Sequence, residues 1–320
     1  MIDMEIRQQK VASRAECPLC GCTHLMPILD QRPDYEYHVN VGLSYAICRN
    51  PMCGLVFATT IPPIEVIQKF YTKYSTHRQH RPSRIALIIE SFGVKNRERY
   101  LLSLFRGADV KRLNVLDYGC GSGDFMHQLM GLGVGEVVGY DFDPEACACA
   151  RERGLTVFAS EREARAEGPY DYVFLNHVVE HLSDPVADLT AQALLLKPGG
   201  RLIIRTPNSR SFLARLFGRD WRGWETPRHL HIFNTRSSQQ LMTKVGLAEL
   251  TVVSVATSNA MFIGMFHESF HGDFWRATAA GKLLRHVACS AILPVAYVAN
   301  ALWKNLGEEV LVVVEKRGAV

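Results

Sequence analysis

The feature that most constrains the fold is a strand, turn and helix pattern at residues 114–123. An apolar run with Asp117 near its end leads into a turn that carries Gly119, Gly121 and Gly123. Glycine lacks a Cβ, so it adopts positive φ angles and lets a ligand approach the backbone closely. The helix expected after the turn directs free N–H groups and the positive end of its dipole toward it. The pattern therefore predicts a site for an anionic group, such as a phosphate or an amino-acid carboxylate.

A second carboxylate narrows the kind of ligand that this turn can bind. The next apolar run ends at Asp141, and an acid at the end of the second strand can accept hydrogen bonds from both hydroxyls of a ribose. A dinucleotide fingerprint needs a further glycine at the start of the helix, where this chain has Asp124. A dehydrogenase is therefore the weakest alternative.

From residue 113 onward, apolar runs alternate with segments of helical periodicity. This alternation is typical of a parallel sheet covered by helices on both faces. Strands are expected at 113–118, 136–141, 155–159, 171–176, 201–206, 248–254 and 308–315. Helices are expected at 123–132, 144–153, 184–196 and 238–245. Thr235 is the expected cap of the last helix. The sequence therefore predicts an α/β fold with a doubly wound, Rossmann-like, mostly parallel seven-stranded sheet.

The order of these motifs resembles that of the class I S-adenosylmethionine (SAM)-dependent methyltransferases. Besides the D-x-G-x-G-x-G turn and Asp141, the runs N-H-V-V-E-H at 176–181 and L-K-P-G-G-R-L at 196–202 carry the resemblance, which covers residues 110–255. The resemblance implies SAM as the cofactor, with its methionine part on the glycine turn and its ribose on Asp141. The cofactor-binding residues implied in this way are Asp117, Gly119, Cys120, Gly121, Gly123, Asp141, Phe142, Asn176 and His177.

Three histidines are candidates for the base that removes a proton from the methyl acceptor: His229, which ranks first, His181 and His177. His229 lies in the run P-R-H-L-H-I-F at 227–233, which also contains His231. This run resembles the substrate-side segment of a bacterial subgroup of small-molecule methyltransferases that often carry an N-terminal zinc module. Histidine is readily poised as a base near neutral pH, although a hydrogen-bonded structural role is an equal alternative.

The segment H-V-V-E-H at 177–181 also bears on a catalytic metal. Some ubiquinone-type O-methyltransferases carry E-x-x-E-H at this place and use it with a divalent metal. Here His177 replaces the first acid. We therefore do not predict a catalytic metal at this segment.

Two close cysteine pairs lie near the start of the chain, Cys17 with Cys20 and Cys48 with Cys53, and a glycine follows each pair. Four thiolates at tetrahedral positions form a closed structural Zn²⁺ site. Metal binding would supply much of the folding free energy of so small a module. We therefore predict structural zinc, with Cys22 as a substitute for Cys20 and four free cysteines as the alternative.

These motifs divide the chain into three parts. Residues 1–60 form a zinc-ribbon-like module, 61–110 a linker with helices, and 111–320 the SAM-binding methyltransferase domain. This domain carries insertions at 207–234 and 257–306. The first insertion is long and aromatic, which is typical of a lid or a binding wall.

The second insertion contains residues 287–303, which carry no charge and are near the lower limit for spanning a bilayer. Pro294 and Asn300 interrupt this stretch, and a true span would separate the last strand from its sheet. A buried or lid helix is therefore the favoured interpretation. A peripheral membrane contact is the alternative, and it would favour a lipid-linked substrate.

Composition limits the class of protein. A net charge of +4 does not indicate a nucleic-acid partner, and no charged and apolar leader opens the chain. Nine cysteines without an export signal indicate a reducing compartment, so the expected location is the cytoplasm. The sequence does not indicate the oligomeric state.

The predicted reaction is transfer of a methyl group from SAM to a small-molecule acceptor, which would be a sugar, a ring hydroxyl or a lipid-linked metabolite. An in-line transfer needs proximity and alignment, and a base when the acceptor is a hydroxyl. The alternatives are an RNA or protein methyltransferase that uses the zinc module for recognition, and a non-catalytic SAM-binding protein.

Overall fold

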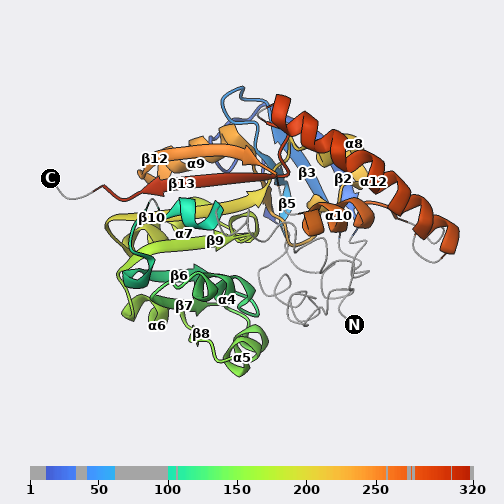
Figure 1. Ribbon diagram of the computed structural model, residues 1–320. Helices are drawn as coiled ribbons and strands as arrows, with labels where there is room; N and C mark the ends of the chain where they lie inside the picture. The colour runs from blue at the N-terminus through green and yellow to red at the C-terminus, as the bar shows by residue number, and fades with distance from the viewer. Residues whose placement is uncertain are drawn as a thin grey trace, which may run out of the picture.

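The computed structural model describes most of the chain and is shown in Figure 1. The described residues are 12–33, 42–61, 100–105, 107–256, 259–271, 275, 278–303 and 305–317. The linker and most of the helices expected between 61 and 110 lie outside these ranges. Of that region, residues 100–104 are helical, as expected, and Leu101, Leu104 and Phe105 are buried.

A seven-stranded sheet forms the centre of the molecule, and every strand expected from the sequence is present. The strands are β6 (Asn114–Tyr118), β7 (Glu136–Tyr140), β8 (Val157–Phe158), β9 (Tyr170–Asn176), β10 (Leu196–Pro207), β12 (Ala248–Val255) and β13 (Glu309–Glu315). Their order is β12-β13-β10-β9-β6-β7-β8. Strands β6 to β10 pair in parallel, and β13 runs antiparallel to both β10 and β12. The predicted mostly parallel, Rossmann-like sheet is confirmed.

Helices cover both faces of this sheet (Figure 1). They are α4 (Asp124–Gly131), α5 (Pro144–Glu152), α6 (Glu161–Ala166), α7 (Pro185–Leu194) and α9 (Thr235–Val245). Neighbouring strand residues point to opposite faces. Leu116 accordingly packs in one core cluster with residues of α6, α7 and α9, whereas Val115 packs in another with Leu129 of α4. This alternation explains the apolar runs of the strands, because both faces are buried.

The cap of α9 differs from the prediction. Asn234, not Thr235, is the N-cap, because its side chain accepts hydrogen bonds from the backbone N–H groups of Arg236 and Ser237. The Ser237 hydroxyl in turn accepts a hydrogen bond from the backbone N–H of Asn234. This reciprocal capping box starts the helix three residues earlier than the sequence pattern indicates.

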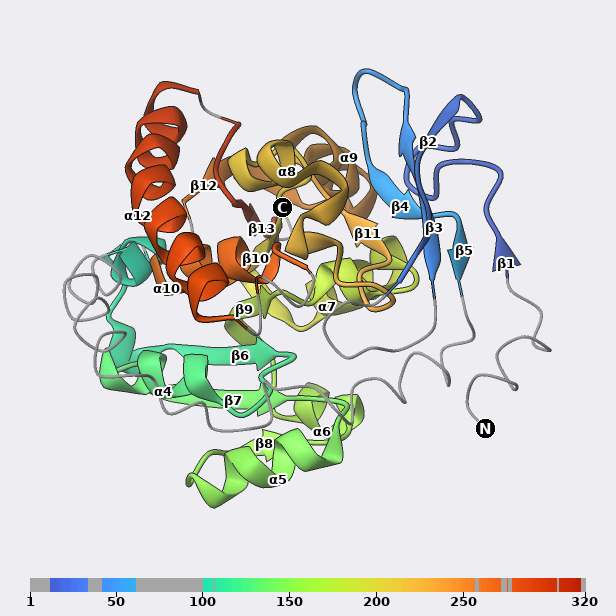
Figure 2. The same cartoon turned by 90° about the vertical axis from the view of Figure 1, so that its right-hand side faces the viewer.

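A second sheet joins the cysteine-rich module to the methyltransferase domain. Its order is β11-β4-β3-β2, formed by β2 (Leu25–Arg32), β3 (Leu43–Cys48), β4 (Val56–Ala58) and β11 (His231–Ile232). Strands β1 (Ala12–Ser13) and β5 (Thr60–Ile61) pair separately. Strand β11 comes from the insertion at 207–234 and pairs antiparallel with β4. The module sheet is therefore completed by a distant segment, as Figure 2 shows.

The insertion at 207–234 is largely packed core. It forms α8 (Phe212–Phe217) and the 3-10 turns η4 (Gly218–Asp220) and η5 (Arg222–Trp224). Trp221 and Trp224 are buried in one cluster with Tyr45 of the module and Phe266 of the second insertion. The expectation of a lid is wrong for these aromatic residues, because their rings fill the space between the module and the second insertion.

The second insertion forms α10 (Asn259–Glu268) and α12 (Ala279–Leu302). Figures 1 and 2 show α12 on the outside of the molecule, with α10 beside it. The expectation of a buried helix is wrong, because apolar side chains such as Val287 and Leu302 are exposed. Helix α12 is long and apolar enough to cross a membrane by length and composition, and 17% of its apolar window is buried inside the protein.

Candidate active site and cysteine cluster

The glycine turn after β6 has the backbone that the sequence predicts. Gly119, Gly121 and Gly123 all have positive φ angles, between 53° and 82°. A Cβ at Gly119 would lie 2.5 Å from the side chain of Val178, whereas a Cβ at Gly121 would meet nothing within 4 Å. The protein therefore packs closely against the turn at Gly119 and leaves open space beside Gly121.

Two acids meet at this turn. The carboxylate of Asp141 accepts hydrogen bonds from the backbone N–H groups of Gly121 (2.8 Å) and Asp143 (2.9 Å). Asp117 is buried, and its Oδ2 has no hydrogen-bond partner among the described residues. Burial, and then the charge of Asp141, raise the pKa of Asp117 to about 7. A buried carboxylate oxygen without a partner fits a ligand that brings its own donor, such as an ammonium group.

The other side chains at this turn differ in exposure. Phe142 follows Asp141 and is 46% exposed. Cys120 is buried against Gly139, where an added Cβ would lie 2.7 Å from the Cys120 Sγ. The Cys120 thiol thus fills core space, and only its backbone belongs to the turn.

The end of β9 places Asn176 against Asp117 and His177 in a left-handed conformation, with φ 56°. The ring of His177 makes close contacts with Glu309 (2.7 Å) and Glu180 (3.3 Å). Burial by itself lowers the pKa of His177, but these two carboxylates outweigh it and raise the pKa to about 10. A pKa in this range favours the cationic form of His177 at neutral pH, which does not suit a base, and its predicted role as the base stays a prediction.

His181 and His229 form an edge-to-face pair with ring centroids 4.7 Å apart. Each ring places Nδ1 at a backbone carbonyl, that of Arg228 for His181 (3.1 Å) and that of Gly223 for His229 (2.8 Å). Burial lowers the pKa of both histidines, and that of His229 to about 4. In the neutral tautomer that donates from Nδ1, the basic lone pair of each ring lies on Nε2.

Buried charges surround this pair, and the sequence analysis missed them. Glu225 forms ion pairs with Arg222 and Arg228 and lies 3.4 Å from His229. Glu180 is fully buried and accepts a hydrogen bond from the Thr206 hydroxyl. The run E-T-P-R-H places an acid three residues before an arginine, but the sequence gives no sign that both charges are buried.

Glu180, His181 and His229 could also hold a metal ion, since their ligand atoms lie within 4.8 Å of one another. Both imidazoles engage a backbone carbonyl through Nδ1, which is the usual support of a metal-binding histidine. The sequence analysis did not predict a metal here, because His177 replaces the first acid of the E-x-x-E-H pattern. The third ligand of this group, His229, comes instead from a segment distant in the sequence.

The four predicted zinc ligands lie together. The sulfur atoms of Cys17, Cys20, Cys48 and Cys53 all lie within 4.8 Å of one another, and the pairs Cys17–Cys53 and Cys20–Cys48 are 3.9 and 3.5 Å apart. The Cys22 thiol instead faces the carbonyl of His24 at 3.8 Å. The donor set and its burial fit a closed structural zinc site, in which each sulfur would be a thiolate ligand.

The module also contacts the histidine segment directly. The Tyr45 hydroxyl donates to the His229 carbonyl (2.9 Å), and the Ala58 N–H donates to the Leu230 carbonyl (2.9 Å). His231 is fully buried with its Nε2 2.9 Å from Arg14, which indicates a structural role. The backbone that carries His229 is thus held by the cysteine-rich module.

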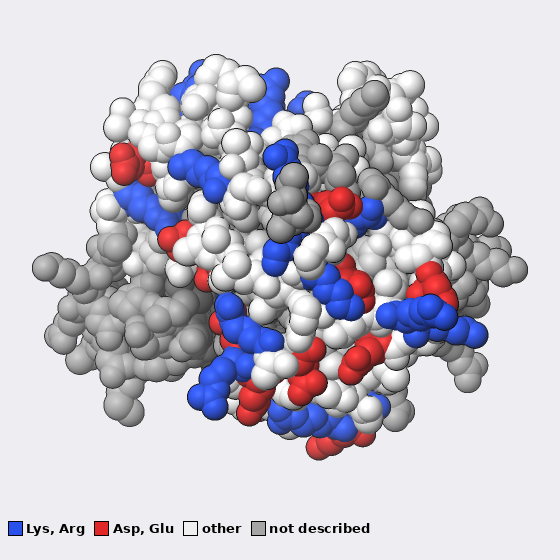
Figure 3. Space-filling view, turned by 90° about the vertical axis from the view of Figure 1, so that its left-hand side faces the viewer, with Lys and Arg blue, Asp and Glu red and all other residues white. Residues whose placement is uncertain are grey.

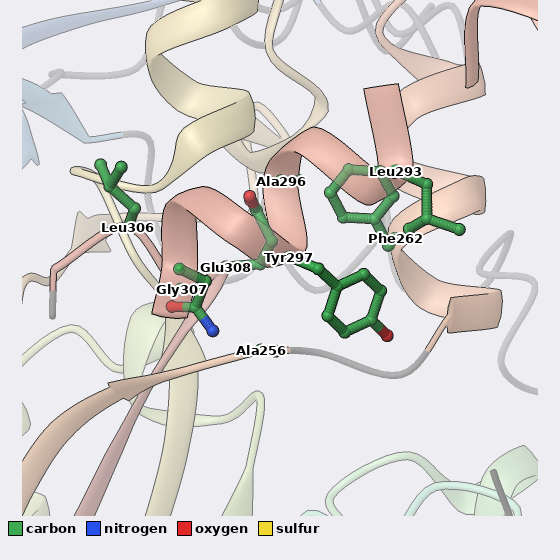
Figure 4. A pocket seen from close by; sticks show the side chains of 9 residues that line it. Ala256, Phe262, Leu293, Ala296, Tyr297, Leu306, Gly307 and Glu308 are labelled. Atoms are coloured by element: carbon green, nitrogen blue, oxygen red, sulfur yellow. The ribbon is translucent and has the colours of Figure 1, made fainter. Parts of the chain in front are cut away.

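A pocket lies between α10, α12 and the start of β13 (Figure 4). Its lining is mainly apolar and includes Phe262, Leu293 and Tyr297. Glu308 also lines it, is 3% exposed, and has one carboxylate oxygen without a hydrogen-bond partner among the described residues. Burial raises the pKa of Glu308 to about 7. The next residue, Glu309, contacts His177 at the end of β9.

Comparison with known proteins agrees with this geometry. Residues 77–252 match the methyltransferase domain family. The chain is a class I SAM-dependent methyltransferase. This methyltransferase is 34% identical over 184 residues to a ubiquinone biosynthesis O-methyltransferase of Cereibacter sphaeroides, a match that covers 51% of this chain and 72% of that protein.

A further relative of this methyltransferase is named for a protein substrate, and a solved methyltransferase is also similar to it. It is 32% identical over 152 residues to the ribosomal protein L11 methyltransferase of Dechloromonas aromatica, which covers 44% of this chain and 50% of that protein. It is also similar to a solved SAM-dependent methyltransferase from Archaeoglobus fulgidus, with 18% identity, a TM-score of 0.44, and coverage of 73% of this chain and 100% of that one. The predictions of a methyltransferase and of SAM as its cofactor are confirmed.

Proposed function

We propose that this methyltransferase methylates a hydroxyl group of a small-molecule acceptor, such as a sugar, a ring hydroxyl or a lipid-linked metabolite. The observation that carries the proposal is the position of the His181 imidazole, five residues after the end of β9, against the ring of His229 and with Nδ1 at the Arg228 carbonyl. A hydroxyl needs a base to lose its proton, whereas a neutral amine does not. The relatives named ubiquinone biosynthesis O-methyltransferases support an oxygen acceptor.

We assign the cofactor site to the turn after β6 and its neighbours. SAM supplies an electrophilic methyl group when it is bound. Asp117 would pair with the ammonium of its methionine part, Asp141 would accept from the ribose hydroxyls, and the exposed ring of Phe142 would cover the adenine. The backbone of Gly119, Cys120, Gly121 and Gly123 completes the site, with Asn176 and His177 on the side of the methyl group.

The three candidate histidines receive different roles in this proposal. His181 is partly exposed and neutral, so it is the base. His229 is 3% exposed and lies behind His181, so it positions that ring and does not take the proton itself. His177, held as a cation by Glu180 and Glu309, contributes positive charge near the end of β9. This order replaces the sequence-based ranking, which placed His229 first.

Zinc would complete the fold of the module. We propose that Cys17, Cys20, Cys48 and Cys53 bind one structural Zn²⁺ and that the module at 1–60 serves mainly to hold the segment at 227–233. The pairing of β11 with β4 supports this role. So do the hydrogen bonds from the Tyr45 hydroxyl to the His229 carbonyl and from the Asn234 side chain to the Gly54 carbonyl. In this proposal the rest of the chain consists of a linker at 61–110 and the methyltransferase domain at 111–320.

The charge distribution on the face of the molecule in Figure 3 does not favour a nucleic-acid substrate. Figure 3 shows that Lys and Arg alternate with Asp and Glu over the described residues of one face of the methyltransferase domain. An RNA-binding surface needs a continuous basic stripe, because most of its affinity comes from phosphate contacts. The relative named ribosomal protein L11 methyltransferase keeps a protein acceptor as the second candidate.

The decisive experiment incubates the purified enzyme with methyl-labelled SAM and an extract of its source organism. The extract is then separated into lipid, small aqueous, protein and RNA fractions. Label in the lipid or small aqueous fraction supports the proposal, provided that Asp141→Ala, which removes the ribose contact, abolishes it. Label in the protein or RNA fraction would instead establish a macromolecular acceptor. Binding of SAM without any transfer would favour the non-catalytic alternative.

Once an acceptor is known, two variants test the base. His181→Asn should lower kcat at least 100-fold at neutral pH and leave the Kd for SAM unchanged, because general-base catalysis contributes roughly two to four orders of magnitude. The loss should shrink as the pH rises and the acceptor ionises without help. In His229→Asn the Tyr45 hydroxyl still has its backbone partner, so the fold is kept and a smaller loss is expected. An equal loss in both variants at every pH would argue against His181 as the base.

A further inference from the structure

Helix α12 presents a continuous apolar stripe to solvent. Its members are spaced three or four residues apart, so they lie on one side of the helix. They are Leu284, Val287, Ala291, Val295, Val298 and Leu302. All six are exposed, and Leu302 retains 66% of its accessible surface. Single exposed apolar residues are common, but a stripe along a whole helix marks an interaction surface.

The opposite side of α12 belongs to the protein. Gly281, Cys289, Ala296 and Ala299 are buried, and the helix packs against α10 and α8. The chain then returns to β13, which lies inside the seven-stranded sheet. A helix that crossed a bilayer would have to leave these contacts. The helix can therefore meet a membrane only by lying along its surface.

The charges around α12 indicate what the stripe contacts. Residues 274–307 contain four cationic side chains and no acidic one. In the sequence, Arg276 and Lys304 flank the helix and Lys282 and Arg285 lie in its first two turns. Lys282 is exposed, whereas Arg285 is half-buried and donates to the His267 carbonyl (3.0 Å). Trp303, at the end of the helix, is 59% exposed, and tryptophan is typical of the interface between headgroups and acyl chains. A segment with four cations and no acid in its sequence suits an anionic lipid surface better than a neutral one.

A second copy of the chain fits less well. If two α12 helices packed antiparallel, cations from opposite ends would meet, and a parallel pair would also bring like charges together. In neither case does the sequence between 274 and 307 offer an acid to compensate. Like charges that face each other destabilise a contact.

We propose that α12 is an interfacial helix that seats this enzyme on an anionic bilayer, with its axis along the membrane surface and its apolar stripe between the lipid headgroups. This surface is independent of the acceptor and of the histidine base. Its test therefore uses binding alone, and the outcome does not depend on the proposed reaction.

The experiment measures co-sedimentation of the full-length, zinc-loaded enzyme with vesicles of phosphatidylcholine, with or without phosphatidylglycerol. Binding to the anionic vesicles should be at least tenfold tighter than to the neutral ones and should weaken with salt. The double variant Val287→Asn and Val298→Asn should lower the affinity at least tenfold. The matched control is Leu194→Asn on α7, which removes an equally exposed apolar side chain elsewhere, at 69% exposure. This control should bind like the wild type.

Tryptophan fluorescence supplies a second measurement. Trp303 is exposed, Trp275 is half-buried, and Trp221 and Trp224 are buried, so anionic vesicles should shift the emission to the blue and Trp303→Phe should remove most of the shift. All substituted positions are exposed, so unchanged melting temperatures will show that the variants fold. The proposal is overturned if the wild type does not bind anionic vesicles, or if the double variant of the stripe binds them as tightly as the wild type. It is also overturned if sedimentation velocity shows that the wild type is a dimer and that the double variant of the stripe is a monomer.

Discussion

The pH dependence of SAM binding follows from the environment of Asp117. Its carboxyl group is buried beside Asp141, which raises its pKa to about 7, and its Oδ2 has no partner among the described residues. Only the ionised form can attract the ammonium group of SAM. We therefore expect the affinity for SAM to increase as the pH rises through neutrality, and Asp117→Asn to remove this dependence.

The size of the effect can be worked out from the pKa. A group with this pKa is about one-tenth ionised at about pH 6 and about three-quarters ionised at about pH 7.5. Because the apparent Kd varies inversely with the fraction of competent protein, it should fall roughly eightfold over this range. The amino group of SAM loses its own proton at about pH 8, so the measurement stays below that value.

The same shift affects the stability of the ligand-free enzyme with a defined sign. The pKa of Asp117 is raised on folding, so the folded state keeps a proton that the unfolded state has lost. The associated stability is full below about pH 4 and is lost as the pH rises to about 7, with an upper limit of about 4 kcal/mol for a shift of about three units. SAM should therefore raise the melting temperature more at about pH 7.5 than at about pH 6.

Isothermal titration calorimetry at several pH values tests this reasoning. Asp117→Asn should bind SAM more weakly at about pH 7.5 and show no change in Kd across the range. The matched control is Asp109→Asn, which neutralises an exposed carboxylate in the loop before β6 and keeps its capping role. A wild-type Kd that does not vary with pH, or an Asp117→Asn variant that keeps the full slope, would refute the assignment of Asp117.

Two further predictions concern the glycine turn and the cysteine cluster. Gly119→Ala should weaken SAM binding at least tenfold in calorimetry, because the new Cβ would lie 2.5 Å from a valine side chain behind the turn. Gly133→Ala has the same φ of 80° but no atom within 4 Å of its Cβ, so it should cost stability through backbone strain and leave the Kd unchanged. Cys53→Ser should lower the bound zinc, measured by elemental analysis, and reduce the melting temperature by at least about 5 °C, because metal binding supplies folding free energy. Cys149→Ser, outside the cluster, should retain one zinc per chain; equal metal loss in both variants would contradict the assignment.

The elements of the methyltransferase domain could be predicted from the sequence because their signals are local. Apolar runs mark β6, β7 and β9, and glycines mark the turn at Gly119 and Gly121. The approach of the four cysteines was also predictable, because each pair is close in the chain and zinc requires four ligands. Resemblance to a known family then connected these elements in the right order.

The cap of α9 and the role of the aromatic insertion were not predictable in the same way. Asn234 and Thr235 are both common capping residues, and only the geometry shows which side chain reaches the free N–H groups. The segment with Trp221 and Trp224 was predicted to be a lid or a binding wall, because the partners of these rings, among them Tyr45 and Phe266, are distant in the sequence. Burial by distant residues leaves no trace in a local pattern.

The sequence by itself determined the sheet, the glycine turn after β6 and the clustering of four cysteines. The tertiary structure alone decided that β11 completes the sheet of the module, that His229 lies buried behind His181, and that the apolar side of α12 faces outward. The physical reason is the range of the interactions. Strand and turn preferences act between neighbours in the chain, whereas burial, charge and strand pairing at a site are set by side chains that only folding brings together.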